Sequence, residues 1–179
     1  ISSTSQDMLS TLDSYLDQTQ AYDLQIQSTL GLTKADVTSL EKLSDVASVQ
    51  GIYAKDELIE PVARTTTRQE NDETAIAKVI GVPKQLNKIT LVKGQLPQKD
   101  NEIVVEEAYL KKNKVKIGDS LKMNDPDLTN ETYQIVGTVK SPLYFSKVHR
   151  GTTSLGDGRI DYFMYVKPSV FKQDMYSAI

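Results

Sequence analysis

VKGQLPQKDNEIVV, residues 92–105, is the stretch of this sequence that decides the fold class. Gly94 and Pro97 mark a turn, because glycine accepts tight backbone conformations and proline interrupts regular pairing. Glu102 then opens a short run of branched apolar residues, 103–105, of the kind that fills a buried strand. A turn followed by so short a strand predicts a β-rich unit.

The same spacing continues on both sides of this stretch. Short β-prone runs alternate with turn signals, and they predict strands at 89–92, 103–105, 120–123 and 133–139. Gly118, the Asp125-Pro126-Asp127 turn and Gly137 punctuate the series, and one short helix is expected over 106–113. We therefore predict a small β-rich lobe over residues 89–139.

The flanking sequence has a different character. Residues 2–20 show a narrow apolar stripe at helical spacing, which predicts an N-terminal stalk helix over 1–20. A strand at 22–29, a helix from Thr33 to about Ser44 and a strand at 46–53 then make a split βαβ unit; Thr33 and Asp36 form its capping box. Further strands are expected at 75–82 and 160–166, and a last helix at 170–178.

These patterns predict an α+β fold with three parts. The stalk helix occupies 1–20, an α/β lobe occupies 21–88 and 140–179, and the β-rich lobe at 89–139 is inserted into it. We also expect the C-terminal end to lie on the same lobe as the stalk helix.

Composition restricts the function classes. The chain has 179 residues, of which 39% are hydrophobic and 25% charged, the ordinary range of a globular protein. A net charge of −3 argues against nucleic-acid binding, and the lack of cysteine excludes disulfides and cysteine metal sites. No apolar run is long enough to span a bilayer and no signal peptide is visible, so we expect an excised piece of a larger protein.

Two stretches carry a resemblance to a known family. The first stretch is similar to a run of residues in the extracytoplasmic core domains of FtsX/MacB-type ABC transporter permeases. It consists of Val92 to Pro97, Asn101 to Val105, Ala108 to Leu110 and Val115 to Asp119. Residues 133–139 resemble the next strand of that family. Residues 141–145, 150–158 and 162–166 resemble its Gram-positive branch.

The resemblance implies that the α/β lobe at 21–88 and 140–179 is porter-like. It also implies a non-enzymatic domain on the extracellular side of the cell membrane. It implies coupling to a cytoplasmic ATPase subunit through the permease's membrane helices, and contact with a second permease copy or a cell-envelope partner. It implies no cofactor. Such domains return a final strand to their first lobe, whereas the predicted helix at 170–178 ends this sequence, so we expect a sheet edge without a partner.

The candidate sites are few. His149 stands alone, without the residues of a triad or a metal site. The glycine-rich loop 151–158 precedes a strand rather than a helix, which argues against phosphate cradling. With its flanking cations it is nevertheless the best candidate interaction loop, through Lys147, His149, Arg150 and Arg159. We predict no catalytic residue, cofactor site or metal site.

Two charged clusters remain open at this level. Asp125, Asp127, Asn130 and Glu131 have oxygen ligands for calcium but not the spacing of an EF-hand, which favours a solvated turn. Lys111, Lys112, Lys114 and Lys116 suit a solvated helix end, or a surface that faces anionic lipid or wall polymer. A secreted or wall-attached binding module is the alternative function, and a hydrolase with an unfamiliar site is a third.

Overall fold

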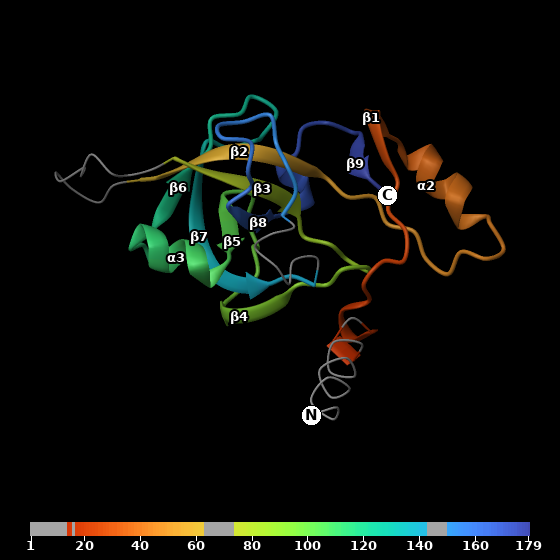
Figure 1. The fold of residues 1–179 in the computed structure, drawn as a ribbon, viewed down its shortest axis with the longest axis horizontal. Coiled ribbons are helices and arrows are strands. Elements are labelled where there is room, and N and C mark those ends of the chain that lie inside the picture. The colour runs from red at the N-terminus through yellow and green to blue at the C-terminus, as the bar shows by residue number, and fades with distance from the viewer. Residues whose placement is uncertain (1–13, 16, 63–73, 143–149) are drawn as a thin grey trace.

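A seven-stranded sheet forms the larger part of the chain in the computed structural model, which describes residues 14–15, 17–62, 74–142 and 150–179 (Figure 1). The strand order is β4-β7-β5-β8-β3-β2-β6, and β6 also pairs with β7. Six of the strands therefore pair in a closed ring, and β4 lies outside it on β7. The strands are β2 (Ala54–Pro61), β3 (Ala75–Gly81), β4 (Thr90–Gly94), β5 (Glu102–Val105), β6 (Ser120–Lys122), β7 (Thr132–Lys140) and β8 (Tyr162–Val166).

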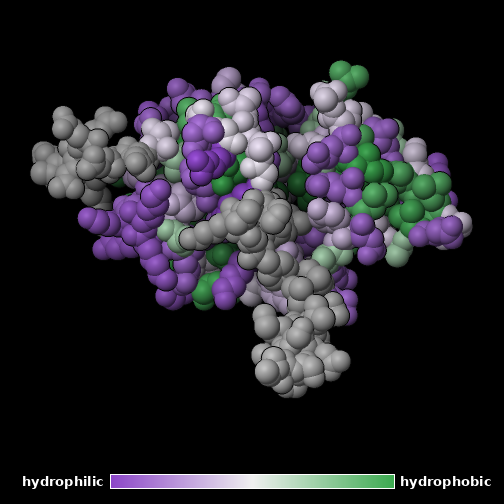
Figure 2. All heavy atoms as spheres, viewed as in Figure 1, coloured by the Kyte–Doolittle hydropathy of each residue, from purple (hydrophilic) through white to green (hydrophobic). Residues whose placement is uncertain are grey.

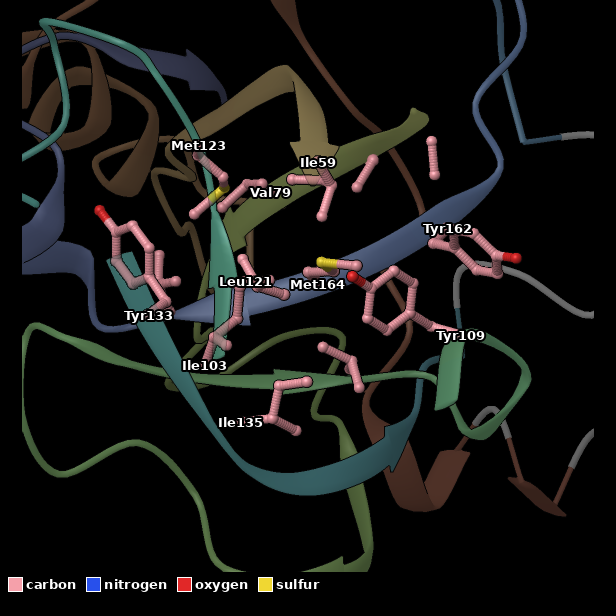
Figure 3. Close-up of a cluster of buried hydrophobic side chains, with 14 of the residues drawn as sticks. Ile59, Val79, Ile103, Tyr109, Leu121, Met123, Tyr133, Ile135, Tyr162 and Met164 are labelled. Carbon is pink, nitrogen blue, oxygen red and sulfur yellow. The ribbon is translucent and has the colours of Figure 1, made fainter. Parts of the chain in front are cut away.

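The core of the sheet lies on both faces of its central strands. Every residue of β5 and β8 is buried, so these strands read as continuous apolar runs rather than alternating ones. Inside the ring, Ile103, Met164 and Tyr109 pack together (Figure 3). On the other face, Val104 and Phe163 belong to a second buried cluster. Helix α3 (Glu107–Asn113) follows β5 and inserts Tyr109 into the first cluster.

The contact between β4 and β7 needs two glycines. Gly94 has φ +77° and pairs with Gly137 across the antiparallel ladder. A Cβ on Gly94 would collide with the carbonyl oxygen of Val136, and one on Gly137 would lie 2.7 Å from the carbonyl oxygen of Lys93. Gly94 is thus the last paired residue of β4 rather than part of a turn with Pro97, and close backbone approach together with a positive φ requires glycine there.

A smaller unit of β1 (Gln27–Leu32), α2 (Lys34–Glu41) and β9 (Tyr176–Ala178) lies at the opposite end of the molecule from α3 (Figure 1). β1 and β9 pair antiparallel, and Ile52 bridges to the other side of β9. The predicted capping box is present: the Asp36 N–H donates to Thr33 Oγ1, and the Thr33 N–H donates to Asp36 Oδ2. No residue of α2 is buried.

The predicted helix at 170–178 is wrong. A short 3₁₀ turn, η2 (Pro168–Val170), is followed by extended chain and then by β9. Two tertiary contacts fix this conformation: Phe171 bridges antiparallel to Leu128, and the Lys172 N–H donates to the carbonyl of Asp127. The final strand that the sequence was expected to lack is therefore present as β9.

The split βαβ unit also differs from the prediction. β1 pairs with β9 rather than with the strand after α2, and the predicted strand at 46–53 is reduced to the bridge at Ile52. The strands of 89–139 share one sheet with β2, β3 and β8, so the lobe boundaries predicted at 89 and 139 fall inside a continuous hydrogen-bonded sheet. The α+β class and the strands at 75–81, 102–105 and 132–140 are confirmed.

The two ends of the described chain are tied to different places. Ile179 exchanges backbone hydrogen bonds with Ile26 of the small unit, while the carbonyls of Thr19 and Gln20 accept from Lys88 and Asn87. Residues 14–15 and 17–19 are helical, and most of the predicted stalk lies outside the described residues. A search of the described residues for a helix long and apolar enough to cross a membrane finds none.

Candidate functional site

A pocket of about 350 Å³ lies between α3 and the loop that leads into β8. Helix α3 contributes Ala108 and Lys112 to its wall. The loop contributes Arg150, Gly151, Arg159, Ile160 and Asp161, and β8 contributes its first residue, Tyr162. The pocket therefore brings together two of the four residues predicted for an interaction loop. Lys147 and His149 lie outside the described residues.

Arg150 is a buried anchor rather than a free surface cation. Its guanidinium makes a two-pronged ion pair with Glu106, at 2.5 Å to Oε2 and 3.0 Å to Oε1, and also donates to the carbonyl of Asp161 at 2.9 Å. It lies 5.0 Å from the ring centroid of Phe163, within cation–π range. Its side chain is only 10% exposed, so its role is to hold the pocket wall together.

Glu106 was missed by the sequence reasoning. It stands between β5 and α3, and besides Arg150 it accepts a hydrogen bond from the backbone N–H of Phe163 in β8. The Glu106 carboxylate thus connects the loop that contains Arg150, the start of α3 and strand β8. No local pattern indicates this, because its two partners lie 44 and 57 residues further along the chain.

Arg159 is the exposed cation of the pocket. Its side chain is 83% exposed, and its Nε lies 3.6 Å from a carboxylate oxygen of Asp157. The glycine-rich loop before it is ordered by a bridge between Thr152 and Arg159 and by a hydrogen bond from Thr153 to Gly158. This loop leads into β8, so the argument against a phosphate cradle is supported by the geometry.

The acidic turn at 125–127 binds an internal cation. Lys55 Nζ, on β2, lies 2.5 Å from Asp125 and 2.8 Å from Asp127. Two carboxylates that already share an ammonium group are poor ligands for calcium, and within the described parts of the chain no group of three acidic or imidazole side chains is placed to hold a metal. The turn is ion-paired rather than solvated.

Glu57 lies beside this turn with its side chain inside the protein. The residue is 5% exposed, and its Oε1 has no hydrogen-bond partner. Burial, a shared hydrogen bond with Asp125 and the charge of Asp125 raise the pKa of Glu57 to about 8. Burial acts on Asp125 as well, but its hydrogen bonds with Glu57 and Lys55 hold the pKa of Asp125 below its ordinary value.

The same turn fastens the segment that leads to β9. Asp127 accepts from the Lys172 N–H at 2.9 Å through its carbonyl, and from Gln173 Nε2 at 2.9 Å through its carboxylate. The Thr129 N–H donates to the carbonyl of Val170, and Lys172 Nζ donates to the carbonyl of Pro126. We call the contact between 125–129 and 170–173 the joint, because it connects the large sheet to the small unit.

A second contact between the two units depends on one side chain. The Gln50 Oε1 accepts hydrogen bonds from the backbone N–H groups of three consecutive residues, 84–86, and its Nε2 donates to the carbonyl of Leu86. Tyr53, three residues further on, stacks on Phe171 at 5.6 Å between ring centroids. Strand β9 is also fastened to the chain that enters β2, through the bridge between Ile52 and Ala178 and the hydrogen bonds between Ser177 and Ala54.

The polar side chains of the described pocket lining are those of Lys112, Arg150, Arg159, Asp161 and Tyr162. Its two arginines are paired with carboxylates.

The small unit has an apolar groove on its surface. The groove lies between residues 21–26, α2 and the segment 45–50. Leu24 is 74% exposed and Leu30 is 84% exposed. Figure 2 shows hydrophobic side chains gathered over this end of the molecule, where α2 lies in Figure 1.

Comparison with known proteins gives a family match and several structural likenesses. The sequence profile of the MacB-like periplasmic core domain matches residues 1–178. A comparison with curated proteins finds no match.

Three solved structures illustrate the structural likeness. The extracellular domain of the noncanonic ABC-type transporter YknZ from Gram-positive bacteria shares 14% identity and a TM-score of 0.48, over 84% of this chain and 72% of that one. The periplasmic region of MacB from Actinobacillus actinomycetemcomitans shares 17% and 0.37, over 81% and 68%. A domain of a permease protein from Porphyromonas gingivalis shares 11% and 0.45, over 83% of this chain and 60% of that one.

Proposed function

This chain belongs to the family of MacB-like periplasmic core domains, and from that premise we propose that it couples ATP-driven motion of a transporter to events outside the membrane. It would act as a non-catalytic extracellular domain of an ABC transporter permease. Its partners would be a cytoplasmic ATPase subunit, reached through the membrane helices, and a second permease copy or a cell-envelope partner. The domain would transmit this motion either to the export of a substrate or to the control of that envelope partner.

The joint is the observation that supports this proposal best. The large sheet has a continuous apolar core, whereas local contacts connect the small unit to it: the joint, the hydrogen bonds of Gln50, the bridge between Ile52 and Ala178 and the hydrogen bonds between Ser177 and Ala54. Two bodies connected by a short extended segment and polar contacts can change their relative position without unfolding either core. A coupling domain requires this property.

A disulfide across the joint tests whether its motion is needed. Leu128 and Phe171 are antiparallel bridge partners, so their Cα atoms lie about 4.5–5.5 Å apart, within disulfide range. The chain has no cysteine of its own, which makes the background clean. In the full-length permease assembled with its ATPase, we expect oxidation of L128C/F171C to lower ATP hydrolysis several-fold and reduction to restore it.

The matched control is a disulfide inside the large sheet. Lys122 on β6 and Thr132 on β7 are antiparallel partners, and a cross-link between them leaves the joint unlocked. Oxidised K122C/T132C should hydrolyse ATP at the rate of the reduced form. If the oxidised L128C/F171C transporter is as active as its reduced form, the coupling proposal fails.

A further inference from the structure

Positive charge is concentrated at the end of the molecule remote from the C terminus. The segment 107–116 carries four lysines against one glutamate, in a chain whose net charge is −3. We call Lys111, Lys112, Lys114 and Lys116 the lysine ridge. All four residues are exposed, and α3 lies at the opposite end of the molecule from β9 (Figure 1). Hydrophilic side chains cover that end in Figure 2.

Core packing and hydrogen bonds fix the backbone of the lysine ridge, so the lysine side chains project from fixed Cα positions. Val115, between the ridge lysines, packs against the core cluster and donates its N–H to the carbonyl of Leu110. The Asp119 carboxylate accepts from the Lys116 N–H at 3.0 Å. Lys114 has φ +52°, a left-handed conformation that favours glycine after a helix, yet a lysine stands there.

The ridge has more cations than the nearby acids neutralise. Glu107 lies 3.3 Å from Lys93 and 3.9 Å from Lys111, so one carboxylate serves two lysines. Lys114 and Lys116 form no ion pair with the described residues. The neighbouring arginines differ, because Arg150 is paired with Glu106 and Arg159 with Asp157. The ridge cations without an ion pair to a described residue are therefore the lysines Lys114 and Lys116.

The residue types indicate the chemistry of the partner. Arginine suits planar, two-pronged recognition of carboxylates, whereas the lysine ammonium is a point charge that contacts phosphate oxygens from many directions. A protein partner would also require an apolar or aromatic anchor at the centre of the contact. The apolar side chains on either side of Lys116 are Val115, which is half-buried against the core, and Ile117, which is 37% exposed, so no large exposed anchor stands at the centre of the ridge. A flexible chain of phosphates fits such a surface better than a folded protein does.

We propose that the lysine ridge docks a flexible phosphate polymer of the cell envelope. The inference rests on the proposed function, because a phosphate polymer of the envelope is accessible to an extracellular domain. Binding would be electrostatic, reversible and strongly dependent on salt.

Binding of long-chain inorganic polyphosphate to the 179-residue chain tests the proposal. We expect K114Q/K116Q to weaken binding at least tenfold at low salt. For a single-stranded polyanion, each contacted phosphate contributes about −0.7 to the slope of log K against log salt. The wild-type slope should be about −3, and the variant's about half of that. The matched control is K34Q/K42Q, which removes two exposed lysines at α2 and should change affinity less than twofold.

Two further probes separate the sources of negative charge. Poly-L-glutamate of similar length should bind at least tenfold more weakly than polyphosphate, and vesicles rich in phosphatidylglycerol should not retain the chain at the same ionic strength. Equal losses in both lysine variants would overturn the proposal. Poly-L-glutamate binding as tight as polyphosphate would point to an acidic protein, and ridge-dependent vesicle binding to a lipid headgroup; either result overturns it as well. None of these outcomes bears on the disulfide test of the joint.

Discussion

Replacing Arg150 by glutamine is expected to lower the stability of the domain by about 3 kcal/mol, because it leaves the partly buried Glu106 carboxylate without its cation. Glu106 is 19% exposed and would retain the hydrogen bond from the Phe163 N–H. For a chain of this size, about 2–4 °C of unfolding temperature corresponds to each kcal/mol, so the midpoint should fall by about 6–12 °C. Thermal unfolding followed by circular dichroism measures it.

Arg159 provides the matched control. It lines the same pocket and also pairs with a carboxylate, but its side chain is 83% exposed and its Nε lies 3.6 Å from Asp157. An exposed pair of this kind contributes little, so R159Q should shift stability by less than about 0.5 kcal/mol. Similar losses in the two variants would show that Arg150 is not a buried anchor.

Replacing Glu57 by glutamine is expected to stabilise the domain at alkaline pH. The folded-state pKa of about 8 exceeds the ordinary value of 4.5, so the folded protein holds this proton more tightly than the unfolded chain does. The stabilisation is fully present below pH 4.5 and is lost as the pH rises to about 8. Because glutamine does not ionise, E57Q should lack this decline and exceed wild type by at least about 2 kcal/mol at pH 9.

The informative quantity is the difference in unfolding temperature between E57Q and wild type as a function of pH. It should rise between pH 4.5 and 8 and level off above that range. Lys55, Asp56, Asp125, Asp127 and Tyr133 are the titratable groups around Glu57, and all remain in the variant. The control E60Q removes an exposed carboxyl from the same strand and should follow the wild-type profile. A difference for E57Q that does not vary with pH would contradict the account.

The sequence predicts the elements whose stabilising interactions lie between residues that are close in the chain. The capping box of Thr33 and Asp36 marks the start of α2 because both hydrogen bonds lie within four residues. The apolar run at 103–105 likewise marks β5, and Gly94 marks the end of β4. The family resemblance rests largely on these structural residues.

The elements that the sequence did not predict depend on distant partners. Residues 170–178 have a helix-like apolar spacing, but contacts of Phe171 and Lys172 with the 127–128 turn hold the chain extended until β9 pairs with Ile52. Lys55 meets Asp127 across 72 positions and Arg150 meets Glu106 across 44. No pattern within a single window of sequence reports such pairs, so the joint and the buried anchor were both missed.

Motion of the small unit relative to the large sheet is the central claim, and a distance measurement tests it most directly. Spin labels on K42C, at the end of α2, and K122C, on β6, report the separation of the two units in the full-length permease with its ATPase. A pair within the large sheet, K93C and K122C, serves as the reference. We expect the first distance distribution to shift between the nucleotide-free and ATP-trapped states while the reference stays fixed. Coincident distributions for both pairs in the two states would contradict the account.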